Sequence, residues 1–165
     1  MNKIKGENNF KEAERFRNLI LASQRQRNRI YKGVLSEIGI TPSKAEVISV
    51  LMKCQPIYLK ELGEMLICES GSPSRLVERM VKNELVERVK NDSRFVRLQL
   101  TSLGIDKYKF IVKAENQMYE ILEEVYTEDE LQFSNEVLSR FLLESPLSST
   151  LINRGYIHKS EDNVK

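Results

Sequence analysis

The sequence SPSRLVERMVKNELVERVKNDSRFVRLQL, residues 72–100, carries the strongest structural signals in this chain of 165 residues. It begins with Ser72 and Pro73, residue types that favour the cap and the first position of a helix. Apolar residues then recur at helical spacing from Leu76 onward, with basic residues between them. After Leu85 the pattern changes to two strand-like runs, VERVK and FVRLQL, which are separated by a polar tip. We therefore expect a basic helix followed directly by a basic hairpin.

Two further helices are predicted before this segment. One begins at Thr41-Pro42 and ends at Gln55-Pro56, and a shorter one covers residues 59–66, LKELGEML. A tight turn containing Gly71 then leads to Ser72, and two short helices joined by such a turn are the signature of a helix-turn-helix. The fold class predicted is mainly α: a winged helix-turn-helix with a three-helix core and a two-stranded β-wing, flanked by long N- and C-terminal dimerisation helices.

The flanking regions predict those long helices. One runs from about residue 9 to Ile38, and its apolar ends enclose a polar, basic middle. Another follows Thr101, and a capping box at residues 127–130, TEDE, starts the last one. We expect these helices to form a homodimer, with an intramolecular bundle as the alternative. The interface candidates are Phe10, Phe16, Ile20, Leu122, Val125, Leu138 and Phe141.

Charge is distributed unevenly along the chain. The formal net charge is only +2, but residues 73–113 contain ten basic and five acidic side chains, an excess of +5. Residues 114–144 are acidic, with Arg140 as the only lysine or arginine. The basic centre is the kind of surface that attracts nucleic acid. The organisation expected is therefore a dimerisation helix at 1–38, a DNA-binding domain at 39–101, dimerisation helices at 102–145 and a partly ordered tail at 146–165.

Several strings in residues 38–105 resemble the MarR family of bacterial transcription regulators. They are GITPSKAEVISVL, LKELGEML and SPSRLVERM, followed by NDSR and RLQLTSLG at the family spacing. The resemblance implies a homodimer that binds a pseudo-palindromic operator, most simply as a repressor. Glu84 stands where the family usually has the glycine that ends the recognition helix, and Asn83 is the residue expected to adopt the left-handed conformation instead.

The candidate DNA contacts follow from the geometry of the grooves. Only the start of a recognition helix reaches base edges in the major groove, which assigns this role to Ser72, Ser74 and Arg75. Arg79 is expected to face bases or phosphate, and Lys82 phosphate. The remaining candidates lie on the hairpin: Arg94 for the minor groove, Asp92 to position it, and Arg88, Lys90 and Arg97 for phosphates. The alternative for these charges is an ordinary solvated surface.

The family resemblance also implies a small aromatic or phenolic effector, bound between the dimerisation helices and the DNA-binding lobe. In this chain Tyr31, Tyr108 and Met118 are the candidate lining residues, and core packing is the alternative for all three. Cys54 and Cys68 are expected to be small buried residues, and Cys68 is the better candidate for a redox role.

Other classes of function have no support in the sequence. No nucleotide-binding or metalloprotease motif occurs, His158 is the only histidine, and the two cysteines lack metal-ligand spacing. We therefore expect no enzyme activity, no cofactor and no metal. The absence of a signal peptide and of a long apolar run predicts a cytoplasmic protein that does not enter a membrane. The alternative function is a winged-helix protein-interaction module, using the apolar tail residues Leu151, Ile152, Tyr156 and Ile157.

Overall fold

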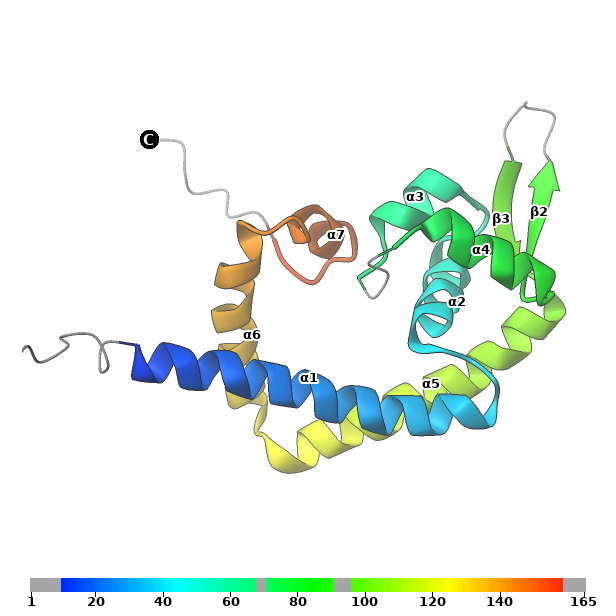
Figure 1. Ribbon diagram of the computed structural model, residues 1–165. Helices are drawn as coiled ribbons and strands as arrows, with labels where there is room; N and C mark the ends of the chain where they lie inside the picture. Colours follow the sequence, from blue (N-terminus) through cyan, green and yellow to red (C-terminus); the bar gives the residue numbers. More distant parts are fainter. Residues whose placement is uncertain (1–9, 68–70, 91–95, 159–165) are drawn as a thin grey trace, which may run out of the picture.

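The computed structural model describes residues 10–67, 71–90 and 96–158. Helices α1 and α5 lie side by side as the long base of the molecule (Figure 1). A lobe made of α2, α3, α4 and the small sheet stands at one end of this base. Helix α6 rises at the other end, and α7 lies between α6 and the lobe. We call α2, α3, α4 and the sheet the winged-helix lobe, and α1, α6 and the C-terminal half of α5 the helical body.

Helix α1 covers Lys11–Glu37, close to the predicted range. Only Tyr31 and Leu35, near its C-terminal end, are buried, and they pack into the core of the lobe. The N-terminal two thirds of the helix make no such contact and are exposed. Gly39, at a φ of +69°, follows the helix in the left-handed conformation that glycine adopts without strain.

The first two helices of the lobe begin as predicted. Helix α2 covers Pro42–Cys54, and the Thr41 hydroxyl caps it by accepting the Lys44 N–H at 3.4 Å. Helix α3 covers Leu59–Glu64, and the Glu61 carboxylate accepts the backbone N–H of Tyr58 at 2.9 Å. Six of the seven positions from 45 to 51 in α2 are buried, and Glu46 alone is half-buried among them. The buried residues are Ala45, Val47, Ile48, Ser49, Val50 and Leu51.

Helix α4 covers Pro73–Lys82, with Ser72 as its N-cap, as the sequence predicts. The prediction for its C-terminal end is wrong. Asn83 keeps a negative φ of −90°, and Glu84 itself takes the left-handed conformation at φ 57°. The chain turns at the position where the family has glycine, because the Leu85 N–H must reach back to the Met80 carbonyl, at 3.0 Å.

The sheet contains strands β1 (Ile57–Tyr58), β2 (Val86–Lys90) and β3 (Val96–Leu100). Their spatial order is β1-β3-β2, and both pairings are antiparallel. The two wing strands agree with the prediction, whereas β1 was not predicted and adds a third strand. Because successive residues face opposite sides, Val86, Leu98 and Leu100 face the core, and Arg88 lies on the same side of the sheet but is exposed.

Helix α5 covers Ser102–Val125 and starts directly from β3. The Thr101 hydroxyl accepts the Gly104 N–H at 3.1 Å and donates to the Glu84 carbonyl at 2.5 Å. Gly104 lies so close to the lobe that a Cβ there would be 2.2 Å from the Leu85 carbonyl oxygen. This contact fixes the start of α5 against the end of α4.

Helix α6 covers Glu128–Leu143, and the predicted capping box at Thr127 and Glu130 is present. The Thr127 backbone and hydroxyl donate to the Glu130 carboxylate, which lowers the pKa of Glu130 below its ordinary value. A short helix, α7, covers Ser148–Asn153 and was not predicted. Cys54 is exposed, which overturns the expectation that it is buried, and Cys68 lies outside the described residues.

Candidate nucleic-acid interface

Helix α4 has one buried and one basic side. Leu76, Val77 and Met80 are buried and hold the helix on the lobe. The opposite side is exposed and carries Ser74, Arg75, Arg79 and Lys82. At its N-terminus the Ser72 hydroxyl accepts the Arg75 N–H at 3.4 Å, so Ser72 has the cap role as well as an exposed position. The structure thus brings five of the predicted DNA-binding residues together on one helix.

The single acidic residue of α4 is neutralised from the wing. Arg88 on β2 donates through Nη2 to Oε2 of Glu78, at 2.5 Å. Both side chains remain substantially exposed, so this ion pair adds little stability. Its main effect is on charge, because the exposed side of α4 then presents uncompensated positive charge. Sequence reasoning missed this pair, since only the register of β2 brings Arg88 over α4.

The other hairpin residues are placed differently from one another. Lys90 is exposed at the end of β2. Arg97 is half-buried, with its guanidinium 4.9 Å from the centre of the Tyr58 ring, on the side of the sheet opposite to Arg88. Asp92 and Arg94 lie outside the described residues, so the roles expected for them stay predictions.

Apolar side chains of the helical body are not covered by this chain. Phe10 and Phe141 are 73% and 74% exposed. All seven residues predicted for dimerisation are exposed: Phe10, Phe16, Ile20, Leu122, Val125, Leu138 and Phe141. An intramolecular bundle would have buried them, and within the described residues α6 contains no buried residue. The helical body therefore leaves large apolar side chains exposed on several of its helices, and exposed apolar surface of this kind can mark a site of protein contact.

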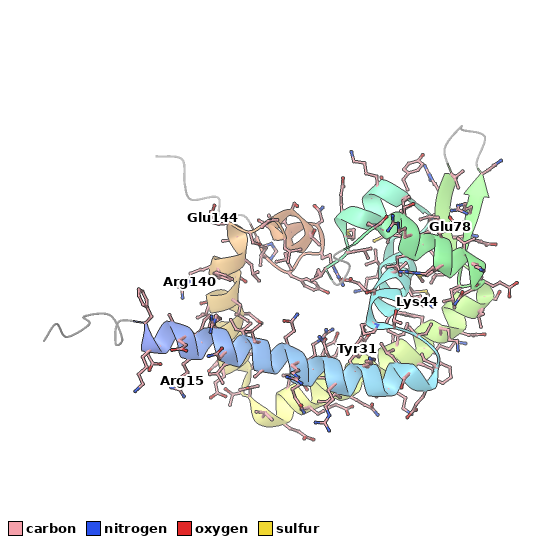
Figure 2. All side chains as sticks on the ribbon, viewed as in Figure 1. Arg15, Tyr31, Lys44, Glu78, Arg140 and Glu144 are labelled. Carbon is pink, nitrogen blue, oxygen red and sulfur yellow. The ribbon has the colours of Figure 1, made fainter. Side chains whose placement is uncertain are left out.

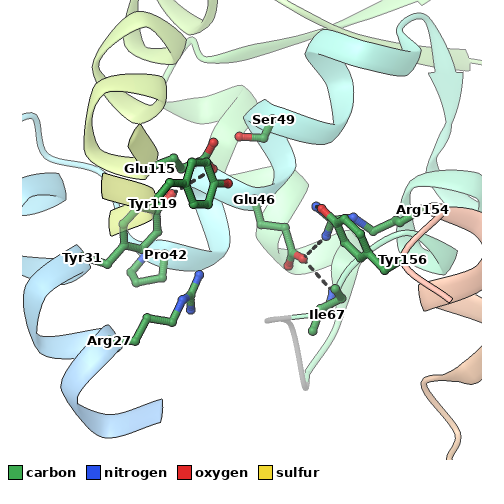
Figure 3. Close-up of a pocket in the computed structure, with 10 residues that line it drawn as sticks. All are labelled: Arg27, Tyr31, Pro42, Glu46, Ser49, Ile67, Glu115, Tyr119, Arg154 and Tyr156. Carbon is green, nitrogen blue, oxygen red and sulfur yellow. Dashed lines mark hydrogen bonds and ion pairs between the residues drawn. The ribbon is translucent and has the colours of Figure 1, made fainter. Parts of the chain in front are cut away.

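A cavity of about 260 Å³ separates the helical body from the lobe (Figure 3). Helices α1 and α5 contribute four aromatic and charged side chains on one side, and α2 contributes a proline, a glutamate and a serine. The C-terminal segment after α7 closes the opposite side. The lining residues are Arg27, Tyr31, Pro42, Glu46, Ser49, Ile67, Glu115, Tyr119, Arg154 and Tyr156.

Two polar groups make this cavity chemically distinct. The Ser49 hydroxyl is buried and has no hydrogen-bond partner among the described residues. The pKa of Tyr119 is raised above its ordinary value, mainly by burial. The nearby Glu115 and Tyr156 raise this pKa further, whereas Arg27 and Arg154 lower it. A buried hydroxyl without a partner is costly, so this cavity suits a small molecule that supplies one.

The residues predicted for an effector are only partly at this cavity. Tyr31 lines it, and its hydroxyl donates to Glu115 at 3.4 Å. Tyr108 instead packs against the core, and Met118 is not among the lining residues. Sequence reasoning missed Arg154 and Tyr156, because the tail has no periodic pattern that would place them near α2.

The tail is part of the fold of this chain. Leu151 and Ile157 are buried, and Ile152 is half-buried, which leaves Tyr156 as the exposed member of the set proposed for a protein partner. In the part of the chain that the structure describes, no group of three or more histidine, cysteine or acidic side chains could hold a metal ion. Among the same residues, no helix is long and apolar enough to cross a membrane.

Comparison with known proteins adds to this geometry. No family model matches the chain. It is 30% identical over 88 residues to the organic hydroperoxide resistance transcriptional regulator of Bacillus subtilis, an alignment covering 52% of this chain and 60% of the relative. The chain thus spans less than two thirds of that relative's length.

Solved structures match over a longer range. A mutant of MarR from E. coli in complex with operator DNA has a TM-score of 0.69 and 25% identity, covering 82% of this chain and 99% of that chain. An organohalide-sensing transcriptional regulator bound to 2,4-dichlorophenol has a TM-score of 0.72 and 18% identity, covering 100% and 99% of the two chains. These proteins are regulators and not enzymes, in agreement with the expectation from the sequence. The winged-helix lobe and the long flanking helices thus give the chain the fold of MarR-type regulators.

Proposed function

We propose that the chain is a sequence-specific transcriptional regulator that binds duplex DNA as a homodimer and represses by occluding a promoter. The observation that carries this proposal is the exposed basic side of α4, whose one acidic residue is neutralised by Arg88. Its similarity to a MarR protein in complex with operator DNA supports the same assignment. Localisation in the cytoplasm fits this role.

Each charged residue then has a role in DNA binding. Ser74 and Arg75, at the start of α4, reach base edges in the major groove. Arg79, Lys82 and Lys90 contact phosphates. Arg94 enters the minor groove, with Asp92 holding it. Arg88 acts mainly by cancelling Glu78, and Arg97 is kept near the DNA by its stacking on Tyr58.

Dimerisation places two such helices on one face of the DNA. Two α4 helices about 34 Å apart would read half-sites one helical turn apart, which requires a pseudo-palindromic operator. The exposed apolar residues of the helical body, from Phe10 to Phe141, supply the surface for the second copy.

The cavity next to Tyr31 is the proposed effector site. Its volume lies just below the ~300–1,000 Å³ of pockets for drug-sized ligands, so it suits a single aromatic ring. The Ser49 hydroxyl would bind a polar substituent of that ring, and Arg27 would favour a negative one. A phenol is a suitable class, as in the organohalide-sensing relative bound to 2,4-dichlorophenol.

Selection of bound sequences from a random DNA pool, followed by fluorescence anisotropy, tests DNA binding directly. Arg75→Ala and Arg94→Ala should each weaken operator binding by about 1–3 kcal/mol. Each lost phosphate contact, such as Lys82→Ala, should reduce the salt slope by ~0.9. Arg140→Ala on α6 is the matched control and should change neither quantity. Unchanged affinity in both Arg75→Ala and Arg94→Ala would refute the site assignment.

The effector proposal has its own test. Titration with 2,4-dichlorophenol should lower operator affinity in the wild type. Ser49→Ala should weaken that response while leaving affinity without the phenol unchanged, because the Ser49 hydroxyl has no hydrogen-bond partner among the described residues. An equal response in both proteins would show that the phenol acts elsewhere.

A further inference from the structure

The C-terminal segment, residues 147–157, returns from α6 to the winged-helix lobe. Helix α7 lies against α3 (Figure 1). Thr150, Leu151 and Ile157 are buried there, so the segment is docked by apolar packing. The segment therefore connects the helical body to the helix-turn-helix by a second route, independent of α5.

Arg154 is the polar anchor of this segment. Its Nη1 atom lies 2.6 Å from Oε1 of Glu46 on α2, and 3.5 Å from the Met65 carbonyl at the end of α3. Its Nη2 atom donates to the Tyr156 hydroxyl at 3.2 Å. The side chains of Arg154 and Glu46 are only 15% and 8% exposed, so salt screens this pair weakly.

The same carboxylate holds the segment that leads to the recognition helix. Oε1 of Glu46 also accepts the backbone N–H of Ile67 at 2.9 Å (Figure 3). Ile67 lies between α3 and α4, in the connection that determines where α4 begins. One oxygen atom of Glu46 thus joins α2, the approach to α4 and the C-terminal segment. Breaking one partner of a buried ion pair leaves an uncompensated charge, so the other contacts of Glu46 would also change.

We propose that Arg154 and Glu46 are positioning residues for DNA binding. They hold the start of α4 in place and, through α7, fix the lobe relative to α6. Neither residue contacts DNA. This inference rests on the proposed function of the chain as a DNA-binding regulator, and it adds the C-terminal segment to the parts that control operator affinity.

Arg154→Gln, in the full chain, removes the charge and keeps a polar side chain. We expect it to reduce operator affinity by about tenfold, within the range typical of coupling between sites. Arg154→Lys keeps the charge and should restore most of the affinity. Arg140→Gln removes the same charge from α6, away from the lobe (Figure 2), and should have no effect.

The salt dependence separates positioning from direct contact. Arg154→Gln should lower affinity without changing the slope of log affinity against log salt, since no phosphate contact is lost. Lys82→Ala should lower that slope by ~0.9. A reduced slope in Arg154→Gln would overturn the proposal by showing that Arg154 contacts DNA, and unchanged affinity would overturn it directly.

Hydrogen exchange of the free protein tests the contact without DNA. Arg154→Gln and Glu46→Ala should speed exchange of the Ile67 amide, with the larger effect in Glu46→Ala, where the acceptor is removed. The Leu51 amide of the core should be unchanged. Equal acceleration at Ile67 and Leu51 would mean global destabilisation and would overturn the proposal. If the wild type bound no operator while Ile67 responded as expected, the proposed function would fail, and the link from Arg154 through Glu46 to Ile67 would stand.

Discussion

The winged-helix lobe and the helical body contain the same kinds of apolar residues but bury them to different extents. The lobe buries its large apolar side chains, including Ile48, Leu51 and Met80, to less than 2% exposure. In the body, α6 buries none and α1 buries only Tyr31 and Leu35. The lobe therefore buries its apolar side chains within this chain, whereas the helical body leaves many of its own exposed. Under the proposed function, the part that would contact DNA is packed within one chain, and the part that would space two copies is left for a second copy to cover.

Among the substitutions that test this contrast, Leu51→Ala should have the largest effect on stability. Leu51 is fully buried in α2, so the change should reduce the free energy of unfolding by about 2–5 kcal/mol. Its neighbour Met52 is 37% exposed, and Met52→Ala should cost less than ~1 kcal/mol. Urea denaturation measures both. Similar losses in the two variants would show that the lobe is not packed as described.

Phe141→Ser tests the body in the same way. If a second copy covers Phe141, the substitution should weaken dimerisation by about 2 kcal/mol or more, as at interface hot spots. Sedimentation equilibrium would report this as a rise of at least ~30-fold in the dissociation constant. Phe110 is 53% exposed and outside the predicted interface, so Phe110→Ser is the control. An unchanged dimer in Phe141→Ser would remove this residue from the interface.

Two glycine-to-alanine substitutions, one in each region, should change the free energy of unfolding in opposite directions. Gly104→Ala places a Cβ against the Leu85 carbonyl and should destabilise the chain by about 1–3 kcal/mol. A Cβ at Gly33 in α1 meets nothing within 4 Å, so Gly33→Ala should stabilise by up to ~1 kcal/mol through helix propensity. Thermal unfolding of both variants decides the matter, and a stabilising Gly104→Ala would contradict the close contact.

Glu84→Gly should relieve backbone strain just after α4. Glu84 has a φ of 57°, a conformation that costs a residue with a side chain roughly 1–2 kcal/mol. Part of this is offset by the greater freedom of glycine in the unfolded chain, so a net gain of about 0.5–1 kcal/mol is expected. Asn83→Gly, at a negative φ, should give no gain. Equal effects of the two glycines in urea denaturation would argue against the strain.

The smallest effect is a pH dependence in the body. The pKa of Glu130 lies below its ordinary value of 4.5, because the Thr127 backbone and hydroxyl donate to the charged form. A lowered pKa stabilises the start of α6 above pH 4.5, and this contribution is lost as the pH falls through the folded-state value. An NMR titration of Glu130 measures it, and Glu130→Gln should remove the dependence. A normal Glu130 midpoint would contradict the capping box.

Local sequence signals predicted most of the fold. Thr41-Pro42, Ser72-Pro73 and the box at Thr127 mark helix starts through side chains within four residues of the backbone that they cap, and those starts are confirmed. Strand β1 was missed because its two residues are too few to show a period. Helix α7 was missed because burial of Leu151 comes from docking on α3 and has no amphipathic repeat behind it.

The candidate sites likewise divide into residues that local sequence patterns predict and contacts that depend on the tertiary fold. The basic residues of α4 follow from helical spacing alone. The pair of Arg88 with Glu78 depends on strand register, and the contact of Arg154 with Glu46 joins residues 108 positions apart. Neither pattern of charges is distinguishable in the sequence from ordinary surface charge. Glu84 was misread for a related reason, because composition favours Asn83 for a left-handed turn while the hydrogen bond from Leu85 to Met80 requires it one residue later.

The contact between Gly104 and Leu85 has a mechanical consequence. Close packing at Gly104 holds the start of α5 rigidly against the lobe, so the rest of α5 extends from the lobe as a rigid rod. At ~1.5 Å per residue, its 24 residues give a rod of ~36 Å. Tilting such a rod by about 5° moves its far end by ~3 Å, close to the ~3.4 Å rise of one base pair. In the proposed DNA-bound homodimer, angular changes too small to disturb packing in the helical body would therefore shift one winged-helix lobe by about one base pair relative to the other.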